Sequence, residues 1–333
     1  MELAWLDPAN PDRRDVDGAV ALQAAARSVD LPDFPAPTVS AFRANLRHGW
    51  EDNAPQTAVL RDAHQRVVGL LEVWLPAWDN RHLGGVEVTV HPEFRRRGLG
   101  TQLADAGVQH VKATGRRLLT AFTRDEEAAA ALCRAFDLKQ ASEAVMRRQD
   151  LLAVDWERVD RESANAQAHA TDYELLRLDA RTPDELMPQV VEMVAAINDA
   201  PTDDLDVEDE VFSPERIRAF ENAMIARGQR WRRVAARHKG TGVLAGHTNV
   251  GVINETPDFG WNGDTSVVRA HRGHRLGLLL KAEMMRWLRE EEPQLRWIVT
   301  GNAAANKHMI QINELLGYRI MHNEVGWQRA LSD

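Results

Sequence analysis

The chain repeats one arrangement of elements at a separation of 177 residues, and this repeat limits its fold more than any other feature. In the first copy an apolar segment at 86–90 precedes a turn rich in arginine and glycine, an amphipathic segment at 101–114 and an apolar segment at 118–123. The second copy has the same order at 264–268, 272–277, 278–290 and 295–300. The offset pairs Glu87 with Asp264, Val90 with Val267, Arg95 with Arg272, Gly100 with Gly277 and Thr123 with Thr300. A strand, a turn and a helix that stay in step in this way indicate a duplicated domain.

The length of 333 residues suits two domains of about 150 residues each. The segment 161–170 between the two copies consists of small and polar residues. We therefore predict an N-terminal domain at 1–155, a linker at 156–172 and a C-terminal domain at 173–333. Strands alternate with helices in each half, which indicates an α/β class. Further strands are expected at 56–60, 67–74, 231–237 and 242–252, and further helices at 15–28, 38–49, 183–198 and 214–227.

The overall composition argues against several classes of protein. A net charge of -9 and a pI of about 5.8 disfavour a nucleic acid as the main partner, since such proteins usually carry a basic surplus. The single cysteine, Cys133, rules out an intramolecular disulfide and leaves no cluster for a structural zinc site, so no metal is expected. No stretch approaches an apolar run of about 20 residues, and the first residues lack a basic start followed by an apolar run, so we expect no membrane span and no signal peptide. We expect a cytoplasmic monomer or homodimer that does not bind a membrane.

The turn at 95–100, with the sequence Arg-Arg-Arg-Gly-Leu-Gly, has the properties of an anion site. Gly98 and Gly100 permit backbone conformations and close approaches that a side chain would prevent. The first amides of the following helix have no partners within the helix, and the helix dipole is positive at that end. A diphosphate could therefore bind there. A tight turn beneath surface arginines is the alternative; a P-loop lysine and a dinucleotide glycine fingerprint are both missing.

The residues around this turn give it a specific resemblance. The sequence Val-Thr-Val-His-Pro-Glu-Phe-Arg-Arg-Arg-Gly-Leu-Gly-Thr-Gln-Leu at 88–103 closely resembles the acetyl-CoA signature of GNAT acetyltransferases. The resemblance implies two tandem GNAT-like domains of α/β (α+β) class, each with a mixed, mostly antiparallel sheet flanked by helices. It implies that strand backbone pairs with the pantetheine arm of acetyl-CoA and that turn amides hold the pyrophosphate. The implied cofactor-binding residues are Val88, Val90, Arg95, Arg96, Arg97, Gly98, Leu99, Gly100 and Thr101.

The second copy resembles the same family over 264–318 but departs from it at Arg275, where the first glycine of the turn is expected. Either the turn is reshaped and cofactor binding weakens, or Arg275 itself reaches a phosphate. The cofactor-binding residues implied in this copy are Val267, Arg272, Gly273, His274, Arg275, Leu276 and Gly277.

A later family motif is better kept in the second copy than in the first. Asn306 occupies the position of an asparagine that contacts the cofactor in the family, and Asn302 lies where the preceding strand ends. A helix cap is an alternative role for Asn302. In the first copy Glu126 falls at the asparagine position, and Asp137 replaces the glycine that ends the next helix. The two sites are therefore not expected to be equivalent.

Acetyl transfer to an amine needs a base for the ammonium and a proton donor for the CoA thiolate. The family often uses a strand carboxylate as base, and Glu87 and Asp264 occupy matched strand positions, where partial burial would raise the pKa. Both could instead point to solvent from an alternating strand. The family's acid is a tyrosine in the last helix, but Cys133 and Asn313 occupy that position, so the acid is not identified.

These features predict an acetyl-CoA-dependent N-acetyltransferase that acts on a primary amine of a small molecule by direct transfer in a ternary complex. The alternative is an acyl-CoA-binding or sensor protein in which one or both domains lack turnover. An acidic run at 200–210 would attract a cationic amine, or it forms a solvated loop.

Overall fold

The computed structural model describes residues 1–331 and divides the chain into two compact units. Unit 1 contains residues 1–142, 204–208 and 324–331, and unit 2 contains residues 143–203 and 209–323. Both units are therefore discontinuous in sequence, unlike the uninterrupted domains at 1–155 and 173–333 that the sequence suggests. No helix within residues 1–331 is both long enough and apolar enough to cross a membrane.

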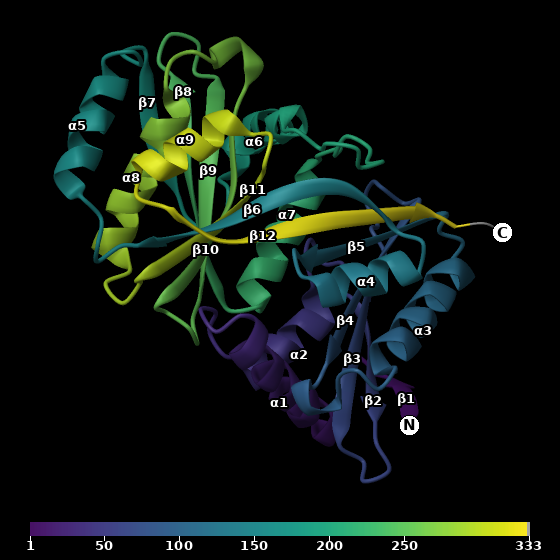
Figure 1. The fold of residues 1–333 in the computed structure, drawn as a ribbon. Coiled ribbons are helices and arrows are strands. Elements are labelled where there is room, and N and C mark those ends of the chain that lie inside the picture. The colour runs from purple at the N-terminus through teal and green to yellow at the C-terminus, as the bar shows by residue number, and fades with distance from the viewer. Residues whose placement is uncertain (332–333) are drawn as a thin grey trace. The chain divides into compact units, whose positions relative to one another are not determined.

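Unit 1 is built on a mixed sheet in which each strand except one pair runs antiparallel to its neighbour. The order is β1-β2-β3-β4-β5-β12 (Figure 1), and β4 and β5 are the parallel pair. The strands are β1 (Glu2–Trp5), β2 (Gln56–Arg61), β3 (Val67–Trp74), β4 (Leu83–Val90), β5 (Leu118–Arg124) and β12 (Arg319–Ala330). The expected strands of the first half form as predicted.

Helices cover both faces of this sheet because successive strand residues point to opposite sides. Val59 and Leu70 pack with α1 (Arg13–Asp30) and α2 (Val39–His48) on one face. Leu60 and Leu71 pack with α3 (Leu99–Ala113) and α4 (Glu127–Ala135) on the other (Figure 1). Asp12 and Thr38 cap α1 and α2 by accepting hydrogen bonds from first-turn amides, which fixes where these helices begin.

Unit 2 has a sheet of the same design, in the order β6-β11-β10-β9-β8-β7, again with a single parallel pair, β10 and β11. Its helices α5, α8 and α9 pack on one face and α6 and α7 on the other. The strands are β6 (Lys139–Asp150), β7 (Tyr173–Leu178), β8 (Gln229–His238), β9 (Leu244–Ile253), β10 (Phe259–Val267) and β11 (Trp297–Ala303). The helices are α5 (Trp156–Gln167), α6 (Met187–Val194), α7 (Pro214–Ala226), α8 (Leu276–Glu291) and α9 (Lys307–Leu315).

The two units exchange strands. Residues 324–330 of β12 pair with β5 in unit 1, and residues 144–150 of β6 pair with β11 in unit 2. The segment expected as a linker, 156–172, contains α5. Val159 and Ala166 of α5 are buried in the core of unit 2 with residues of α8. The mixed, mostly antiparallel sheets with flanking helices agree with the predicted fold class.

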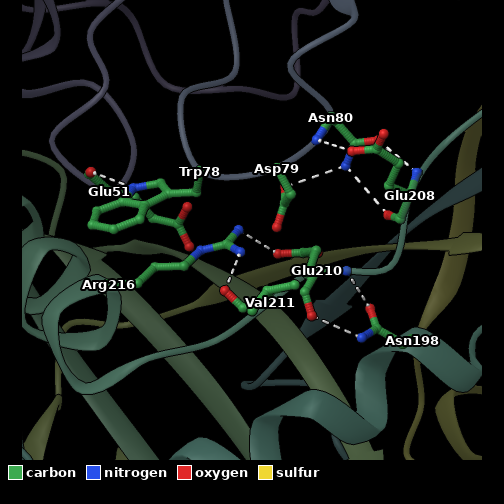
Figure 2. Close-up of polar contacts among 9 residues, drawn as sticks. All are labelled: Glu51, Trp78, Asp79, Asn80, Asn198, Glu208, Glu210, Val211 and Arg216. Carbon is green, nitrogen blue, oxygen red and sulfur yellow. Dashed lines mark hydrogen bonds and ion pairs between the residues drawn. The ribbon is translucent and has the colours of Figure 1, made fainter.

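The acidic run at 200–210 is largely engaged in local contacts. In unit 1 the Glu208 amide donates to Asn80 Oδ1 at 2.7 Å, and the Asn80 amide donates to Glu208 Oε2 at 3.0 Å (Figure 2). In unit 2 Glu210 exchanges hydrogen bonds with Asn198 and forms an ion pair with Arg216 at 2.7 Å (Figure 2). Glu208 and Glu210 therefore hold the loop in place, while Asp204, Asp206 and Asp209 are exposed.

Strand pairing corrects one part of the 177-residue offset. Gly85 of β4 lies opposite Trp74 and Thr120, whereas Trp261 of β10 lies opposite Gly251 and Val299. The bulge in β10 between Asn262 and Thr265 changes the offset within that strand, and the pairs Gly85–Thr120 and Trp261–Val299 give an offset of 179 residues between β5 and β11. Thr123 therefore corresponds to Asn302, and its predicted match with Thr300 is wrong.

A cavity between a divided sheet and a helix start

The parallel strands β4 and β5 separate after a short paired segment. Pairing links Leu83–Gly85 with Leu118–Thr120 and does not continue to Val90, so one backbone edge of 86–90 is left without a neighbouring strand. A cavity of about 780 Å³ lies along this part of unit 1. Its walls come from β4, β5, α1, α3, α4 and the turn before α3. Among the lining residues are Arg27, Glu87, Val88, Val90, Arg95, Arg96, Gly98, Gly100, Thr101, Ala104, Val108 and Cys133.

The turn at one end of the cavity has two left-handed residues, Arg96 with φ of 60° and Gly98 with φ of 81°. Gly98 is the N-cap of α3 and offers no side chain to the first helical amides, which remain available to a ligand. Arg95 holds the turn in place, since Nε donates to Val90 O at 3.1 Å and Nη1 donates to Asp30 Oδ1 at 2.8 Å. The turn therefore presents backbone donors at the positive end of a helix dipole.

The structure places most of the predicted residues of the first copy on this cavity. Val88, Val90, Arg95, Arg96, Gly98, Gly100 and Thr101 line it. Leu99 is instead buried in the core beneath α3. The guanidinium of Arg97 lies 5.2 Å from the centre of the Phe94 ring, and Arg97 is not among the lining residues.

The turn of unit 2 keeps the same backbone shape despite Arg275. Gly273 has φ of 87° and Arg275 has φ of 56°, at the positions that Arg96 and Gly98 occupy in unit 1. Arg272 repeats the contacts of Arg95, because its Nε donates to Val267 O at 3.1 Å and its Nη2 donates to Asp199 Oδ2 at 2.5 Å. Of the two alternatives for Arg275, a reshaped turn is therefore wrong, and the arginine adopts the strained left-handed conformation itself.

The other predicted residues of this turn are engaged within unit 2. Leu276 is buried, and His274 lies against the Tyr173 ring with its Nδ1 3.2 Å from His169 O. A Cβ added to Gly277 would lie 3.2 Å from Ile312 Cδ1, which shows how closely α8 approaches α9.

The space beside α8 contains larger side chains than the space beside α3. Lys281 and Met285 of unit 2 stand at the positions of Ala104 and Val108, which line the cavity of unit 1. Lys281 is 3% exposed, donates a hydrogen bond to Asn262 Oδ1 and lies 4.8 Å from the centre of the Tyr318 ring. Gln149 Nε2 contacts Met285 Sδ at 3.3 Å and donates to Leu316 O at 2.6 Å. These contacts fill the region between α8, α9 and the sheet.

The predicted base Glu87 faces a second carboxylate that the sequence analysis did not identify. Glu72 of β3 lies directly opposite Glu87 of β4 in the antiparallel register. Arg27 of α1 lines the same cavity and interacts electrostatically with both carboxylates. Desolvation by the surrounding protein raises the pKa of Glu87, although its side chain keeps access to the cavity. The constant offset matches Glu72 with Asn249, so the repeat alone could not reveal a carboxylate pair.

Asp264 in unit 2 has different neighbours. Desolvation raises the pKa of its carboxyl, and the charge of buried Arg233 opposes that rise. His247 lies nearby and is also buried; desolvation, together with Arg233, lowers its pKa well below the usual value. Arg233 and His247 stand where unit 1 has uncharged side chains, and neither was among the predicted site residues.

The predicted asparagines have structural partners. Asn306 is the N-cap of α9 and accepts a hydrogen bond from the Met309 amide at 3.2 Å. Asn302 lies on β11, where its Oδ1 accepts a hydrogen bond from buried Asn313 Nδ2 at 2.7 Å, so a helix cap is the wrong role for Asn302. Cys133 lines the cavity of unit 1, and burial raises the pKa of its thiol to about 11.

Comparison with known proteins agrees with this geometry. Residues 24–137 match the model of the acetyltransferase (GNAT) family. The whole chain is similar to a tandem GNAT protein from the clavulanic acid biosynthesis pathway, with 28% identity, a TM-score of 0.80 and full coverage of both chains. A GCN5-related N-acetyltransferase from Sphaerobacter thermophilus gives a TM-score of 0.70 at 15% identity, covering 99% of this chain and 95% of that one. No curated protein sequence matches the chain.

Proposed function

Because the chain belongs to the GNAT acetyltransferase superfamily, we propose that it is an acetyl-CoA-dependent N-acetyltransferase whose reaction takes place in unit 1. The acceptor is a primary amine of a small molecule, and transfer is direct within a ternary complex. The observation that carries the proposal is the cavity of about 780 Å³, which brings the unpaired edge of β4, the turn before α3 and the Glu87 carboxylate together.

The residues of unit 1 fit acetyl-CoA at three points. The amides of the turn would hold the pyrophosphate, with Arg96 and the start of α3 supplying positive potential. The free edge of β4 at Val88 and Val90 would pair with the amide groups of the pantetheine arm, as an added strand would. Small residues on α3 and α4, such as Ala104 and Ala131, leave room for that arm. Acetyl-CoA supplies an acetyl group activated as a thioester.

The role of Glu87 is to take a proton from the acceptor ammonium. A carboxyl whose pKa is raised toward neutrality binds such a proton better than an ordinary glutamate does. Arg27 balances part of the negative charge around it and keeps the carboxylate form accessible.

A specific observation supports the sensor alternative. A tyrosine has an ordinary pKa of about 10, whereas burial raises the pKa of the Cys133 thiol to about 11, so Cys133 is a weaker acid than the tyrosine that it would replace. This shift disfavours Cys133 as the proton donor that the missing tyrosine would provide. The cavity and the turn would be the same in a sensor protein that binds acetyl-CoA in unit 1 but does not transfer its acetyl group.

Isothermal titration with acetyl-CoA tests the binding step. We expect saturable binding that Gly98→Trp abolishes, because the new side chain projects from a residue that lines the cavity. Gly115→Trp is the matched control, since Gly115 also has a left-handed backbone and open space around it but lies after the end of α3. Absence of binding by the unaltered protein, or equal loss in both variants, would contradict the proposed site.

Release of CoA in the presence of a panel of small amines separates the enzyme from the sensor. The enzyme releases CoA with an amine and acetylates it, as mass spectrometry of the product would show. Binding of acetyl-CoA without release across the panel would favour the sensor.

A further inference from the structure

The carboxylates of Glu72 and Glu87 lie side by side in unit 1. Residues directly opposite each other in an antiparallel pair point to the same face of the sheet, with their Cβ atoms about 4.5 to 5.5 Å apart. Two like charges at this separation repel each other, and removal from bulk water makes the repulsion stronger. Among residues 1–331 neither carboxylate forms an ion pair or a hydrogen bond with a cation, and Arg27 interacts with both through space.

The charges around the pair are unequal. Arg27 faces it from α1 and favours ionisation of both carboxyls, whereas Glu324 of β12 disfavours ionisation of Glu87. Among the other charged groups along the cavity, Arg95 is paired with Asp30 at 2.5 Å and Arg124 with Glu126 at 2.9 Å, and Arg96 lies in the turn before α3. Within residues 1–331, Arg27 is the cation that acts on both carboxyls, so one guanidinium faces two carboxylates.

We propose that Glu72 and Glu87 share a single proton at neutral pH and that Glu72 is a positioning residue that sets the proton affinity of Glu87. The proton resides mainly on Glu72, and Glu87, which lines the cavity, stays ionised. The role of Glu87 as the base rests on the proposed function, whereas the shared proton rests on the register and the charges alone.

The direction of the pKa shifts is consistent with this assignment. Desolvation and the charge of Glu87 raise the pKa of Glu72 to about 8, so Glu72 holds its proton at pH 7. In the reaction an N–H bond of the acceptor ammonium breaks and an O–H bond forms on Glu87, which turns a cation and an anion into two neutral groups. A protonated Glu72 allows this exchange, because Glu87 then carries the only negative charge of the pair.

Unit 2 contains a natural variant of the pair. Asn249 stands at the position of Glu72 and faces the bulge that contains Asp264. An amide, like a protonated carboxyl, is uncharged and does not repel the neighbouring carboxylate. Glu72→Gln therefore mimics both the protonated state in unit 1 and the arrangement of unit 2, and it changes the size of the side chain very little.

The test measures the free energy of unfolding of the full chain between pH 5 and 8. The folded state holds a proton that the unfolded chain releases above a pKa of about 4.5, so this contribution to stability falls as pH rises toward 8. Glu72→Gln should remove this fall and make the protein more stable at pH 8 than the unaltered protein. The control is Glu127→Gln, whose side chain is 83% exposed on α4, and it should keep the fall. An unchanged pH dependence in Glu72→Gln would overturn the shared proton.

A second measurement separates positioning from a purely structural role. Glu72→Gln should retain CoA release at pH 7 and lose the step near pH 8 in the pH profile of kcat/KM, because only one carboxyl is left to titrate. Glu87→Gln should lose CoA release at all pH values. If Glu72→Gln keeps the step near pH 8, Glu72 does not set the proton affinity of Glu87. If no amine supports CoA release while the stability result holds, the proposed function fails and the shared proton does not.

Discussion

The two units use the same turn but surround it differently. In unit 1 the turn before α3 opens onto a cavity bordered by Ala104, and in unit 2 the turn before α8 is followed by a helix whose Lys281 is buried against Tyr318. The backbone shape survives a change from glycine to arginine at the left-handed N-cap. An anion site therefore depends on the backbone, whereas space for an acyl-CoA arm depends on the side chains of the helix that follows.

The chemistry beside the strands differs as well. Unit 1 places two carboxylates opposite each other, and unit 2 places a carboxylate near a buried arginine and a histidine. The first arrangement raises the proton affinity of the carboxylates. The second neutralises much of its own charge. Unit 1 is thus better suited to accept a proton from an amine.

The largest effect is expected from removal of the proposed base. Glu87→Gln keeps the shape of the side chain but cannot accept a proton, so amine-dependent CoA release should fall by about 100-fold or more. Asp264→Asn is the matched change in unit 2 and should leave the rate unchanged. If Asp264→Asn instead abolishes release and Glu87→Gln does not, the reaction belongs to unit 2.

A smaller but still large effect is expected when the lysine found beside α8 in unit 2 is introduced at the matched position in the cavity of unit 1. Ala104→Lys places a long side chain in the cavity, and its displacement or burial should weaken acetyl-CoA binding by about 100-fold, equivalent to about 2.7 kcal/mol. Titration calorimetry would measure this change. Ala113→Lys, on the exposed end of α3, should bind as the unaltered protein does. Full affinity in Ala104→Lys would show that the arm does not occupy this cavity.

The sequence was informative where one periodic pattern determines an element. The strands at 56–60 and 67–74 and the helices that follow both turns agree closely with β2, β3, α3 and α8. The exchange of β6 and β12 could not be predicted, because the last strand of each half can pair with either of two sheets that have the same pattern. The sequence analysis did not predict α5 in the linker segment, because most residues of this helix are polar and only a few, such as Val159 and Ala166, are buried.

The candidate site was predicted in part for a similar reason. The turn and Glu87 lie within one continuous motif, so spacing along the chain was enough to find them. Arg27 and Glu72 reach the cavity from other elements, and only the strand register and the position of α1 bring them to Glu87. A local motif also does not reveal how much space surrounds the turn. The large side chains of Lys281 and Met285 therefore did not alter the prediction that the second copy binds the cofactor.

A third comparison concerns Lys281. Burial lowers the pKa of its ammonium group to about 7. The unfolded chain binds a proton at this lysine up to a pKa of about 10.4, so stability should rise between pH 7 and 10, by at most about 1.4 kcal/mol per pH unit. Lys281→Met should remove this rise and stabilise the protein at pH 7. Urea denaturation across that range measures the effect, and Ala104→Met is the comparison in unit 1. A pH dependence that Lys281→Met leaves intact would show that the folded protein keeps this lysine charged.

The smallest effect is expected at Arg275. A non-glycine residue in the left-handed region costs about 1 kcal/mol, and glycine removes most of that cost while giving up part of the gain to a more flexible unfolded chain. Arg275→Gly should therefore raise the free energy of unfolding by somewhat less than about 1 kcal/mol, and Arg96→Gly should do the same in unit 1. Acetyl-CoA separates the two variants, since Arg96 lines the cavity and its loss should weaken binding. If Arg275→Gly destabilises the protein or weakens acetyl-CoA binding as much as Arg96→Gly does, Arg275 contributes contacts that outweigh its strain, and the two turns are closer in function than their surroundings indicate.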